Sequence, residues 1–375
     1  MARRLCYIAT EDWFFVSHFL PFAKAAMAEG FEVSLICNTG EKRAIVEAAG
    51  IRVLALPMTR RSLNPLGLLA GIRGMAALLK QERPDVIHLI ALKPIVLGGL
   101  AARFAGIDRK VLALTGTGYL GLADGVLARS LRFGLRLLRP LLDGPQTRWL
   151  FENRSDPALF GLGRDEARIT VVGGAGIDVA AVTPAPLPDG QTLKVALIAR
   201  MLWSKGIDLA VEATRLARSR GADVSLSLYG APDDHNPRAY SAEQLRAWSK
   251  DGIAWHGPTS DVAGVWAAHH FCCLPSRGGE GLPRTLLEAA ASGRAIVTTD
   301  VPGCRDLVRD GVEGRVVPPN DAAALADALV ALSKDREMVA RMGLAARERL
   351  EQGFTDKQVN AAVVALYNAL VPAKN

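Results

Sequence analysis

Residues 276–303 have the sequence SRGGEGLPRTLLEAAASGRAIVTTDVPG, which opens as a glycine-rich loop and continues as a helix and a strand. Pro283 lies where a helix can begin, because proline suits a first helical turn. The helix predicted over Arg284–Ala291 ends before Gly293, and the apolar run Ala295–Thr299 predicts a strand. We therefore predict a loop–helix–strand unit here.

The two glutamates of this unit favour a ligand site. A helix N-terminus presents unpaired N–H groups and a partial positive charge, so an anionic phosphate binds there readily. Glu280 lies in the loop and Glu288 roughly two turns along the helix, so both can face one cleft at different depths. One can reach a sugar ring and the other a ribose. Either glutamate alone also suits a solvated helix surface, which explains the whole unit less well.

The loop also predicts which backbone groups would hold a phosphate. Glycines at 278, 279 and 281 let the backbone approach a ligand closely. Pro283 has no N–H, so the donors lie on either side of it. The predicted donors are Leu282, Arg284 and Thr285.

Length and composition bound the fold and its partners. The 375 residues suffice for two ordinary domains, and 50% hydrophobic with 6% aromatic residues suits an Ala/Leu/Val-rich α/β protein. The five cysteines show neither a disulfide framework nor metal-ligand spacing, which indicates core thiols in a reducing compartment and no metal. The net charge of +7 favours anionic partners without choosing among nucleotide, nucleic acid and acidic lipid.

Two features bear on localisation. Glu11 and Asp12 interrupt the apolar N-terminus, which argues against a secretory signal. No uncharged run reaches the roughly 18 residues that a membrane span needs. We expect a cytoplasmic protein that is soluble or peripheral on the inner face of the cell membrane.

Apolar strands alternate with helices along the chain. Such alternation indicates βαβ units and doubly wound parallel sheets. The predicted strands include Leu5–Thr10, Glu32–Asn38, Arg52–Leu56, Pro84–Leu89, Lys110–Leu114, Thr147–Glu152, Leu193–Ala199, Asp223–Tyr229, Ile253–His256, Phe271–Pro275 and Glu313–Val317. The stretch EDWFFVSH, residues 11–18, is predicted as a polar and aromatic turn.

A composition break divides this alternation. Residues 183–192, TPAPLPDGQT, contain three prolines and a glycine and predict a linker. It separates a Rossmann-like domain at 1–182 from a second one at 193–356. The last helix, within 357–375, is expected to pack back on the first domain.

Residues 126–142, VLARSLRFGLRLLRPLL, form a basic amphipathic segment. Its arginines recur at three- and four-residue steps against leucines: Arg129, Arg132, Arg136 and Arg139. Such a helix is typical of proteins that lie on anionic membrane surfaces. A core helix with one solvated basic face is the alternative.

A second polar group follows the first strand of the second half. Arg200 and Lys205 come directly after Leu193–Ala199, and ligands of open α/β sheets bind beyond the carboxyl ends of the strands. A pyrophosphate needs about two such cations. The pair alone is weak evidence, but it gains weight from the acidic unit at 276–303, which also follows a strand.

Together these motifs resemble the family 4 glycosyltransferases. The residues that carry the resemblance are Arg200, Lys205-Gly206, Ser276–Gly281, Glu288, Asp300–Gly303 and Asp310-Gly311. The resemblance extends over essentially the whole chain and is most specific across 195–320. It implies the GT-B fold, in which two facing Rossmann-like domains hold the active site in the cleft between them. It also implies a retaining hexosyltransferase that uses a nucleotide sugar, with UDP expected, and needs no metal or other cofactor.

By this resemblance each motif has a role at the donor. The two cations would hold the diphosphate, the loop carboxylate and the helix amides the sugar, and the helix carboxylate the ribose. The strand end 255–257 is where the family frames the base. The expected donor-binding residues are Arg200, Lys205, Leu282, Arg284, Thr285, Glu288 and His256, with Glu280 as a catalytic residue.

The N-terminal half resembles the subgroup that assembles lipid-linked oligosaccharides and surface polysaccharides. The similar residues are Glu11–His18, Ser62–Pro65 and Lys93-Pro94. Its members often add a hexose or N-acetylhexosamine to a sugar on undecaprenyl diphosphate, so we expect a lipid-linked glycan acceptor. His18 is a candidate catalytic contact, with a turn histidine bonded to backbone as the alternative.

The acceptor side departs from the family in one place. Many members have a histidine after the strand that matches Lys110–Leu114, where this chain continues with Thr115-Gly116-Thr117-Gly118. Thr115, Gly116 and Gly118 are therefore expected to contact the acceptor, and the catalytic contact on this side is left open.

Other functions fit parts of the sequence. Gly116–Gly121, GTGYLG, matches the G-x-G-x-x-G dinucleotide fingerprint after a strand, which would suit an NAD(P)-dependent oxidoreductase. It lies far from the first strand, and no acid ends a strand about twenty residues later, as that fingerprint requires. A nucleotide-sugar-binding protein without turnover is a further alternative. A nucleic-acid binder is disfavoured because aromatic residues are not interleaved with the basic ones.

Overall fold

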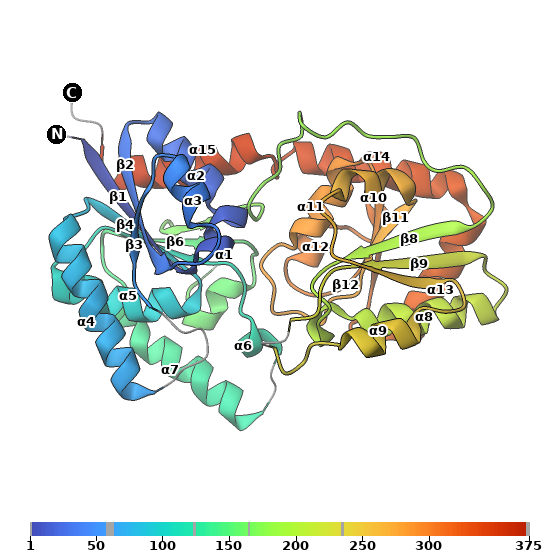
Figure 1. Cartoon of the computed structure of the whole chain (residues 1–375), viewed down its shortest axis with the longest axis horizontal. Helices are drawn as coiled ribbons and strands as arrows, with labels where there is room; N and C mark the ends of the chain where they lie inside the picture. Colours follow the sequence, from blue (N-terminus) through green and yellow to red (C-terminus); the bar gives the residue numbers. More distant parts are fainter. Residues whose placement is uncertain (1, 58–63, 123–124, 164–165, 234–235, 373–375) are drawn as a thin grey trace. The chain divides into compact units, whose positions relative to one another are not determined.

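The computed structural model describes residues 2–57, 64–122, 125–163, 166–233 and 236–372. Its contacts divide the chain into two compact units, Met1–Ala175 with Asp356–Asn375 and Gly176–Thr355 (Figure 1). The proline-rich segment 183–192 lies within the second unit and is not a linker between the two. Pro186 O accepts from Arg294 Nη2 at 3.1 Å and Pro188 O from His270 Nε2 at 3.0 Å. These bonds explain why the boundary differs from the predicted one.

The first unit is a seven-stranded parallel sheet of order β3-β2-β1-β4-β5-β6-β7. Its strands are β1 Arg3–Glu11, β2 Phe31–Asn38, β3 Arg52–Ala55, β4 Val86–Ile90, β5 Lys110–Leu114, β6 Thr147–Phe151 and β7 Ile169–Val171. Its helices are α1 Asp12–His18, α2 Leu20–Ala28, α3 Arg43–Ala48, α4 Pro65–Glu82, α5 Leu92–Ala105, α6 Tyr119–Leu122, α7 Val126–Leu142, η1 Asp156–Phe160 and α15 Asp356–Leu370. Apolar residues of α1, α2 and α15 cover one face, and those of α4, α5 and α7 cover the other.

The second unit is a six-stranded parallel sheet of order β10-β9-β8-β11-β12-β13. Its strands are β8 Leu193–Ile198, β9 Val224–Tyr229, β10 Ile253–Gly257, β11 Phe271–Leu274, β12 Ala295–Thr299 and β13 Gly314–Val317. Its helices are η2 Trp203–Lys205, α8 Ile207–Ser219, α9 Ala242–Trp248, α10 Val262–Ala268, α11 Arg284–Ala291, α12 Cys304–Leu307, α13 Ala322–Lys334 and α14 Arg336–Glu351. Two apolar clusters again cover its two faces. The predicted doubly wound α/β architecture is confirmed in both units.

The C-terminal helix α15 belongs to the first unit. Its Tyr367 hydroxyl lies 2.8 Å from the Tyr7 hydroxyl on β1 and 2.6 Å from His88 Nδ1 on β4, and all three side chains are fully buried. Buried polar groups need such partners. The chain therefore returns to the first sheet after it has formed the second unit.

One predicted turn is a helix in the structure. Residues 12–18 of the EDWFFVSH stretch form α1, and the buried Asp12 carboxylate at its start accepts from the backbone N–H of Gly40 at 2.6 Å and of Lys42 at 3.2 Å. Phe15 then faces the core with no exposed surface.

Two further observations concern the cysteines and the described helices. All five cysteines are free and buried, and no described helix is both long and apolar enough to cross a bilayer.

The strand order reverses once in each sheet. In the first unit the reversal lies between β1 and β4, and in the second between β8 and β11. Ligands of doubly wound sheets bind beyond the carboxyl ends of the strands at such a switch point. Loops that follow these four strands are therefore the places where a site is expected.

Candidate active site

Two predicted residues meet at the switch point of the second unit. Lys205 follows β8 and Glu280 follows β11, and the Lys205 ammonium forms an ion pair with Glu280 Oε2. Ser276 Oγ donates to Glu280 Oε1 at 2.9 Å, which orients the carboxylate. The Lys205 and Glu280 side chains are only 18% and 14% exposed, so little solvent screens their interaction. The structure thus joins the two motifs that the sequence left 75 residues apart.

Arg277 fastens the glycine-rich loop to the loop after β8. Its guanidinium donates twice to the Asp208 carboxylate, with both N–O distances 2.8 Å, and once to Trp203 O at 2.6 Å. A fourth bond runs from Nε to Asn320 Oδ1 at 2.7 Å. Burial favours a raised pKa for Asp208, but its bonds with Arg277 and Tyr240 outweigh burial and lower that pKa. Arg277 was not among the predicted site residues, and its only signal in the sequence is a charged residue inside a glycine-rich loop.

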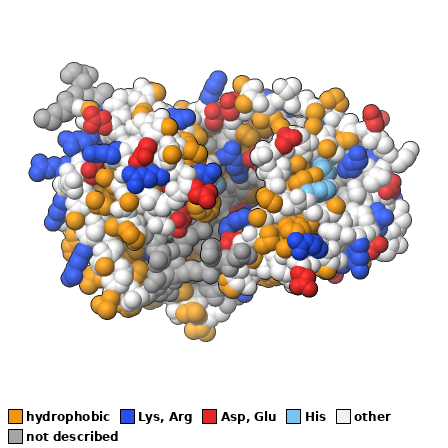
Figure 2. Space-filling model, viewed as in Figure 1, with side chains coloured by type: hydrophobic (Ala, Val, Ile, Leu, Met, Phe, Trp, Pro, Cys, Tyr) orange, Lys and Arg blue, Asp and Glu red, His pale blue; other side chains and the backbone are white. Residues whose placement is uncertain are grey.

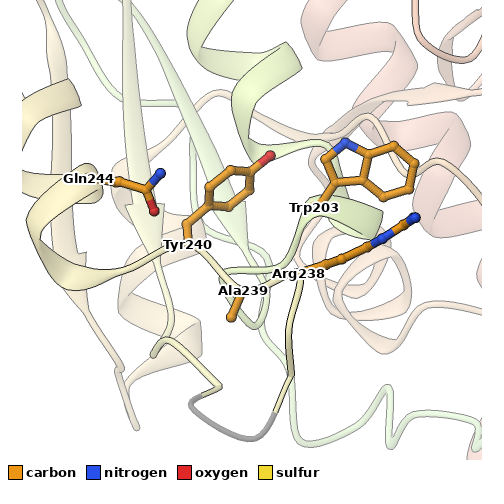
Figure 3. A pocket seen from close by; sticks show the side chains of 5 residues that line it. All are labelled: Trp203, Arg238, Ala239, Tyr240 and Gln244. Atoms are coloured by element: carbon orange, nitrogen blue, oxygen red, sulfur yellow. The ribbon is translucent and has the colours of Figure 1, made fainter.

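Trp203 lies against two guanidinium groups. Arg277 Cζ lies 4.4 Å and Arg238 Cζ 4.6 Å from a ring centroid of its indole. Figure 3 shows the Arg238 side chain running alongside the indole, with Tyr240 and Gln244 on the other side of a pocket of about 230 Å³. Cation–π contacts of this kind stabilise by about 0.5–2 kcal/mol each. They keep the segment that carries Lys205 in one position.

Two glycines allow backbones to approach closely around the site. Gly206 has φ 69°, and a Cβ there would lie 2.0 Å from Pro275 O. Gly303 has φ 83°, and a Cβ there would lie 1.6 Å from Gly281 O. A side chain at Gly206 would push the loop after β8 away from Pro275, and one at Gly303 would push the glycine-rich loop away at Gly281.

Helix α11 begins with no side chain capping its N-terminus. Pro283 is the N-cap residue, one position before the helix, and no side-chain bond to the cap is present. Glu288, on the next turn, accepts from Arg284 Nε at 2.9 Å. Burial raises the pKa of Glu288, although the Arg284 bond and charge act in the opposite direction. The helix therefore offers backbone N–H groups at one end and a desolvated carboxylate one turn along.

The remaining predicted donor residues lie on either side of β9, with Arg200 after β8 and His256 on β10. Arg200 is half exposed and bonds Asp233 Oδ2 at 2.8 Å. His256 is exposed and stacks on Tyr229, with ring centroids 4.7 Å apart and an interplanar angle of 16°. Neither shows a bond with Lys205 or Glu280. Across the described ranges, no group of three or more His, Cys, Asp or Glu residues is placed to hold a metal ion.

The predicted acceptor residues lie at the carboxyl ends of strands in the first unit. His18, the last residue of α1, is half buried, lies 2.6 Å from Ser17 Oγ and stacks on Phe14. Thr115, Gly116 and Gly118 follow β5, the neighbour of β4. No bond between His18 and the Thr115–Gly118 loop is present. Ser62 and Leu63 of the resemblance lie outside the described residues.

Ala91 was not anticipated as a site feature. It lies between β4 and α5 with φ 71°, a left-handed conformation that is costly for a non-glycine residue. Lys93, two residues on, is half buried, and burial lowers its pKa. Strain of this kind clusters at functional sites, and here it lies at the β1–β4 switch point. No property of the alanine itself could have signalled it.

The G-x-G-x-x-G run leads into α6, a helix of four residues. A dinucleotide fingerprint needs the first strand of the sheet followed directly by a long helix whose N-terminus receives the pyrophosphate. Here the run follows β5, which lies two strands away from β1. The geometry does not match that fingerprint.

Comparison with known proteins gives matches in both units. A family model described as glycosyl transferases group 1 matches residues 192–335, and one described as glycosyl transferase 4-like matches residues 4–132. The N,N'-diacetylbacillosaminyl-diphospho-undecaprenol alpha-1,3-N-acetylgalactosaminyltransferase of Campylobacter jejuni is 28% identical over 88% of this chain and 89% of its own length. The UDP-Gal:alpha-D-GlcNAc-diphosphoundecaprenol alpha-1,3-galactosyltransferase of Escherichia coli is 22% identical over 87% and 86%.

Solved structures agree on the fold. Anabaena Alr3699/HepE in complex with UDP and glucose superposes with a TM-score of 0.75 at 17% identity, covering 98% of this chain and all of the other. Sucrose-phosphate synthase from Thermosynechococcus elongatus gives a TM-score of 0.79 at 18% identity, covering 99% and 100%. These similarities confirm the expected GT-B fold.

Proposed function

The chain belongs to the glycosyltransferases that the two family models describe, and we propose that it is a retaining enzyme that transfers a hexose or N-acetylhexosamine from a UDP-sugar to a lipid-linked glycan. The observation that carries this proposal is the Lys205–Glu280 pair at the β8–β11 switch point, beside the uncapped N-terminus of α11. A cation, a carboxylate and the positive N-terminal end of a helix suit a sugar diphosphate.

The diphosphate would be held by positive groups of the second unit. Lys205 supplies an ammonium, Arg200 a guanidinium with five N–H donors, and α11 the positive end of its dipole. Positive groups of this kind stabilise the negative charge that develops on the leaving diphosphate in the transition state. On this basis we propose that transfer needs no metal ion.

Glu280 would bind the sugar and Glu288 the ribose. The Glu280 carboxylate is oriented by Ser276 and Lys205 and can accept sugar hydroxyls on its remaining lone pairs. Glu288 lies one turn into α11, further from the loop, where a carboxylate can accept two ribose hydroxyls. The stacked Tyr229–His256 pair, at the ends of β9 and β10, offers a flat aromatic face for the base.

The acceptor would be bound by loops of the first unit. Thr115–Gly118 and the strained Ala91 lie at the carboxyl ends of neighbouring strands, where loops of this fold class bind ligands. We propose Thr115, Gly116 and Gly118 as acceptor contacts and His18 as a catalytic contact. Two relatives act on undecaprenyl-diphosphate-linked sugars by name, and this supports a lipid-linked glycan as the acceptor.

We further propose that α7 docks the enzyme on an anionic membrane. Leu127, Phe133 and Leu137 expose 66%, 62% and 64% of their surface. In Figure 2 hydrophobic side chains lie along the lower edge of the first unit, where Figure 1 places α7. A helix with an exposed apolar stripe and flanking cations is typical of interfacial binding.

The arginines of α7 support this docking less directly than their spacing suggested. Arg132 donates to Leu120 O at 3.0 and 2.6 Å. Arg136 donates to Ala158 O at 2.9 Å and Arg139 to Gly161 O at 3.2 Å. These arginines therefore brace the helix on its own unit, and the exposed leucines and phenylalanine carry most of the proposed membrane contact.

Product analysis tests the enzymatic proposal. The protein is incubated with a panel of UDP- and GDP-sugars and a sugar linked to a short-chain polyprenyl diphosphate, with and without EDTA. We expect transfer from a UDP-sugar, unaffected by EDTA, and an α-linked product by NMR when the donor is α-linked. A β-linked product would reject retention, and nucleotide binding without any product would favour the non-catalytic alternative.

A further inference from the structure

A pocket of about 270 Å³ lies at the amino end of the first sheet, at the opposite end of β5 from the loop proposed to bind the acceptor. It is enclosed by the last turn of α5, the start of β5, the end of α7 and the loop that follows α7. The residues that line it are Arg103, Asp108, Lys110, Leu141, Asp143, Gly144, Pro145 and Gln146. Its size is close to the lower end of the range of about 300–1,000 Å³ that is usual for small-ligand pockets.

Lys110 is the unusual member of this group. Its residue surface is only 5% exposed, yet its ammonium makes no hydrogen bond or ion pair with any part of the chain that the structure describes. Lysine is almost never buried to this extent without a partner. Burial disfavours the charged form of Lys110 and lowers its pKa, although the nearby charges of Asp108 and Asp143 act in the opposite direction. A ligand that brings negative charge into the pocket would offset the cost of burial.

The carboxylates near Lys110 do not supply that charge directly. Asp143 Oδ1 already accepts from Arg168 Nη1 at 2.7 Å, from Gly144 N at 2.9 Å and from Trp149 Nε1 at 3.3 Å. Asp108 is exposed at the rim, where water solvates its carboxylate. Arg103, also exposed at the rim, has no side-chain partner within the described ranges and adds a second cation.

The pocket opens beside the exposed apolar face of α7. Leu141 lines the pocket and is itself 45% exposed, and Phe104, next to Arg103 on α5, is 65% exposed. An apolar surface next to a basic pocket is the arrangement that binds a lipid headgroup while its chains contact the apolar surface. A free anion would need the basic pocket alone.

We propose that Lys110 and Arg103 form a phosphate-binding site, and that the phosphate it takes is the headgroup phosphate of an anionic membrane lipid. The site belongs to the first unit, whereas the residues proposed to bind the donor belong to the second. It deepens the membrane part of the proposed function by adding a specific lipid contact at the foot of α7.

Trace acetylation of the intact protein tests the site directly, with the labelling rate of Lys110 read by mass spectrometry against that of Lys24. Lys24 is an exposed lysine on α2, over the opposite face of the same sheet. We expect inorganic phosphate and vesicles containing phosphatidylglycerol each to slow labelling of Lys110 severalfold, and neutral phosphatidylcholine vesicles not to. Protection by phosphate alone would keep the anion site and reject lipid as its source. Protection by neither, or equal protection by neutral vesicles, would overturn the proposal.

A variant gives an independent measurement. Lys110→Met keeps the aliphatic stem and removes a desolvated charge, so it should fold with unchanged or higher stability. Its binding to phosphatidylglycerol vesicles should fall about fivefold, the usual effect of one lysine at an anionic surface, whereas Lys24→Met should bind as the wild type does. Equal loss in both variants would show a general charge effect and contradict a site. If the wild type bound no vesicles, the membrane proposal would fail, and the phosphate arm above would still decide the pocket.

Discussion

Arg277 and Asp208 form a two-point ion pair with Nη1–Oδ1 and Nη2–Oδ2 distances of 2.8 Å each. Arg277 lies in the glycine-rich loop that carries Glu280, and Asp208 in the first turn of α8, three residues after Lys205. The pair therefore fixes the distance between the two motifs that we propose bind the diphosphate and the sugar. Arg277 is a positioning residue in this arrangement, because its guanidinium donates to Asp208, Trp203 and Asn320 of its own unit.

Replacing Arg277 by lysine should separate positioning from folding. A lysine keeps the charge but cannot form the two-point contact, so kcat/KM for the donor should fall about 10–100-fold through misplacement of Glu280. Asp208→Asn should give a similar loss, and the double variant should lose little more than either alone. The measurement is a KM and kcat determination with thermal unfolding in parallel.

The matched control for this pair is Arg220→Lys. Arg220 forms a single-point ion pair with Asp327, and both side chains are well exposed. Exposed pairs contribute about 0–1 kcal/mol, so activity should stay within twofold. If Arg277→Lys were as active as Arg220→Lys, the positioning role would be rejected.

Variants at Lys205 and at Glu280 should lose activity for different reasons. Lys205→Met removes the cation proposed to hold the diphosphate, so the affinity for UDP should fall about 10–100-fold, as for loss of a charged hydrogen bond. Glu280→Gln releases Lys205 from its ion pair, so UDP should bind at least as tightly as to the wild type. Transfer should nevertheless fall by about 10²–10³ because the sugar contact is lost. Calorimetry with UDP and product assays with the UDP-sugar distinguish the two. Weakened UDP binding by Glu280→Gln would contradict the assignment.

The sequence predicted the order of elements well because the hydrophobic pattern of each buried strand and its flanking helices is local. Helix α11 and strand β12 have the bounds predicted for them. The pairing of Lys205 with Glu280 was only implied, since contact across 75 residues depends on β8 and β11 being neighbours in the sheet. That strand order follows from the whole topology and from no single segment.

What the sequence missed depends on backbone geometry and on side chains far apart in the chain. Ala91 adopts φ 71° only because β4 and α5 hold both its ends. The proline-rich segment looked like a linker, yet Arg294 and His270 fasten it to the second unit. The turn predicted at residues 11–18 is helix α1 in the structure, and its buried Asp12 bonds the loop after β2. The bonds of Asp12, Arg294 and His270 all reach partners at least 28 residues away in the sequence.

Gly206→Ala should cost more than a left-handed backbone alone explains. The matched control is Gly221→Ala at the end of α8, with φ 84° and no atom within 4 Å of the added Cβ. The control should lose about 1–2 kcal/mol of unfolding free energy from backbone strain. At Gly206 the Cβ would lie 2.0 Å from Pro275 O, so the loss should exceed about 3 kcal/mol or the loop should shift and lose UDP affinity. The prediction would be wrong if the two variants lost equal unfolding free energy and UDP affinity stayed unchanged. The structure would then accommodate the contact between the added Cβ and Pro275 O without cost.

Glu288 should make stability depend on pH. Its pKa in the folded protein is raised by burial, so the folded state holds the proton more strongly than the unfolded state does. The unfolding free energy should therefore fall as pH rises above about 4.5, through the raised pKa, and level off beyond it. Glu288→Gln removes this dependence on pH. In urea unfolding from pH 4 to pH 8, the unfolding free energy of the variant should therefore rise relative to that of the wild type. Glu337→Gln, at a side chain that is 92% exposed, should parallel the wild type. A parallel profile for Glu288→Gln would refute the burial effect.

The apolar face of α7 gives the sharpest test of membrane docking. Phe133 and Leu137 are 62% and 64% exposed, so replacing both with serine should leave thermal stability unchanged. Each apolar side chain that a membrane buries contributes about 1.5–3 kcal/mol, so the two changes together should weaken binding to phosphatidylglycerol vesicles by about a hundredfold or more. Leu344→Ser, at an equally exposed leucine (65%) on α14 of the second unit, is the matched control. Loss of binding in Leu344→Ser as well, or retention in the α7 variant, would place the membrane contact elsewhere.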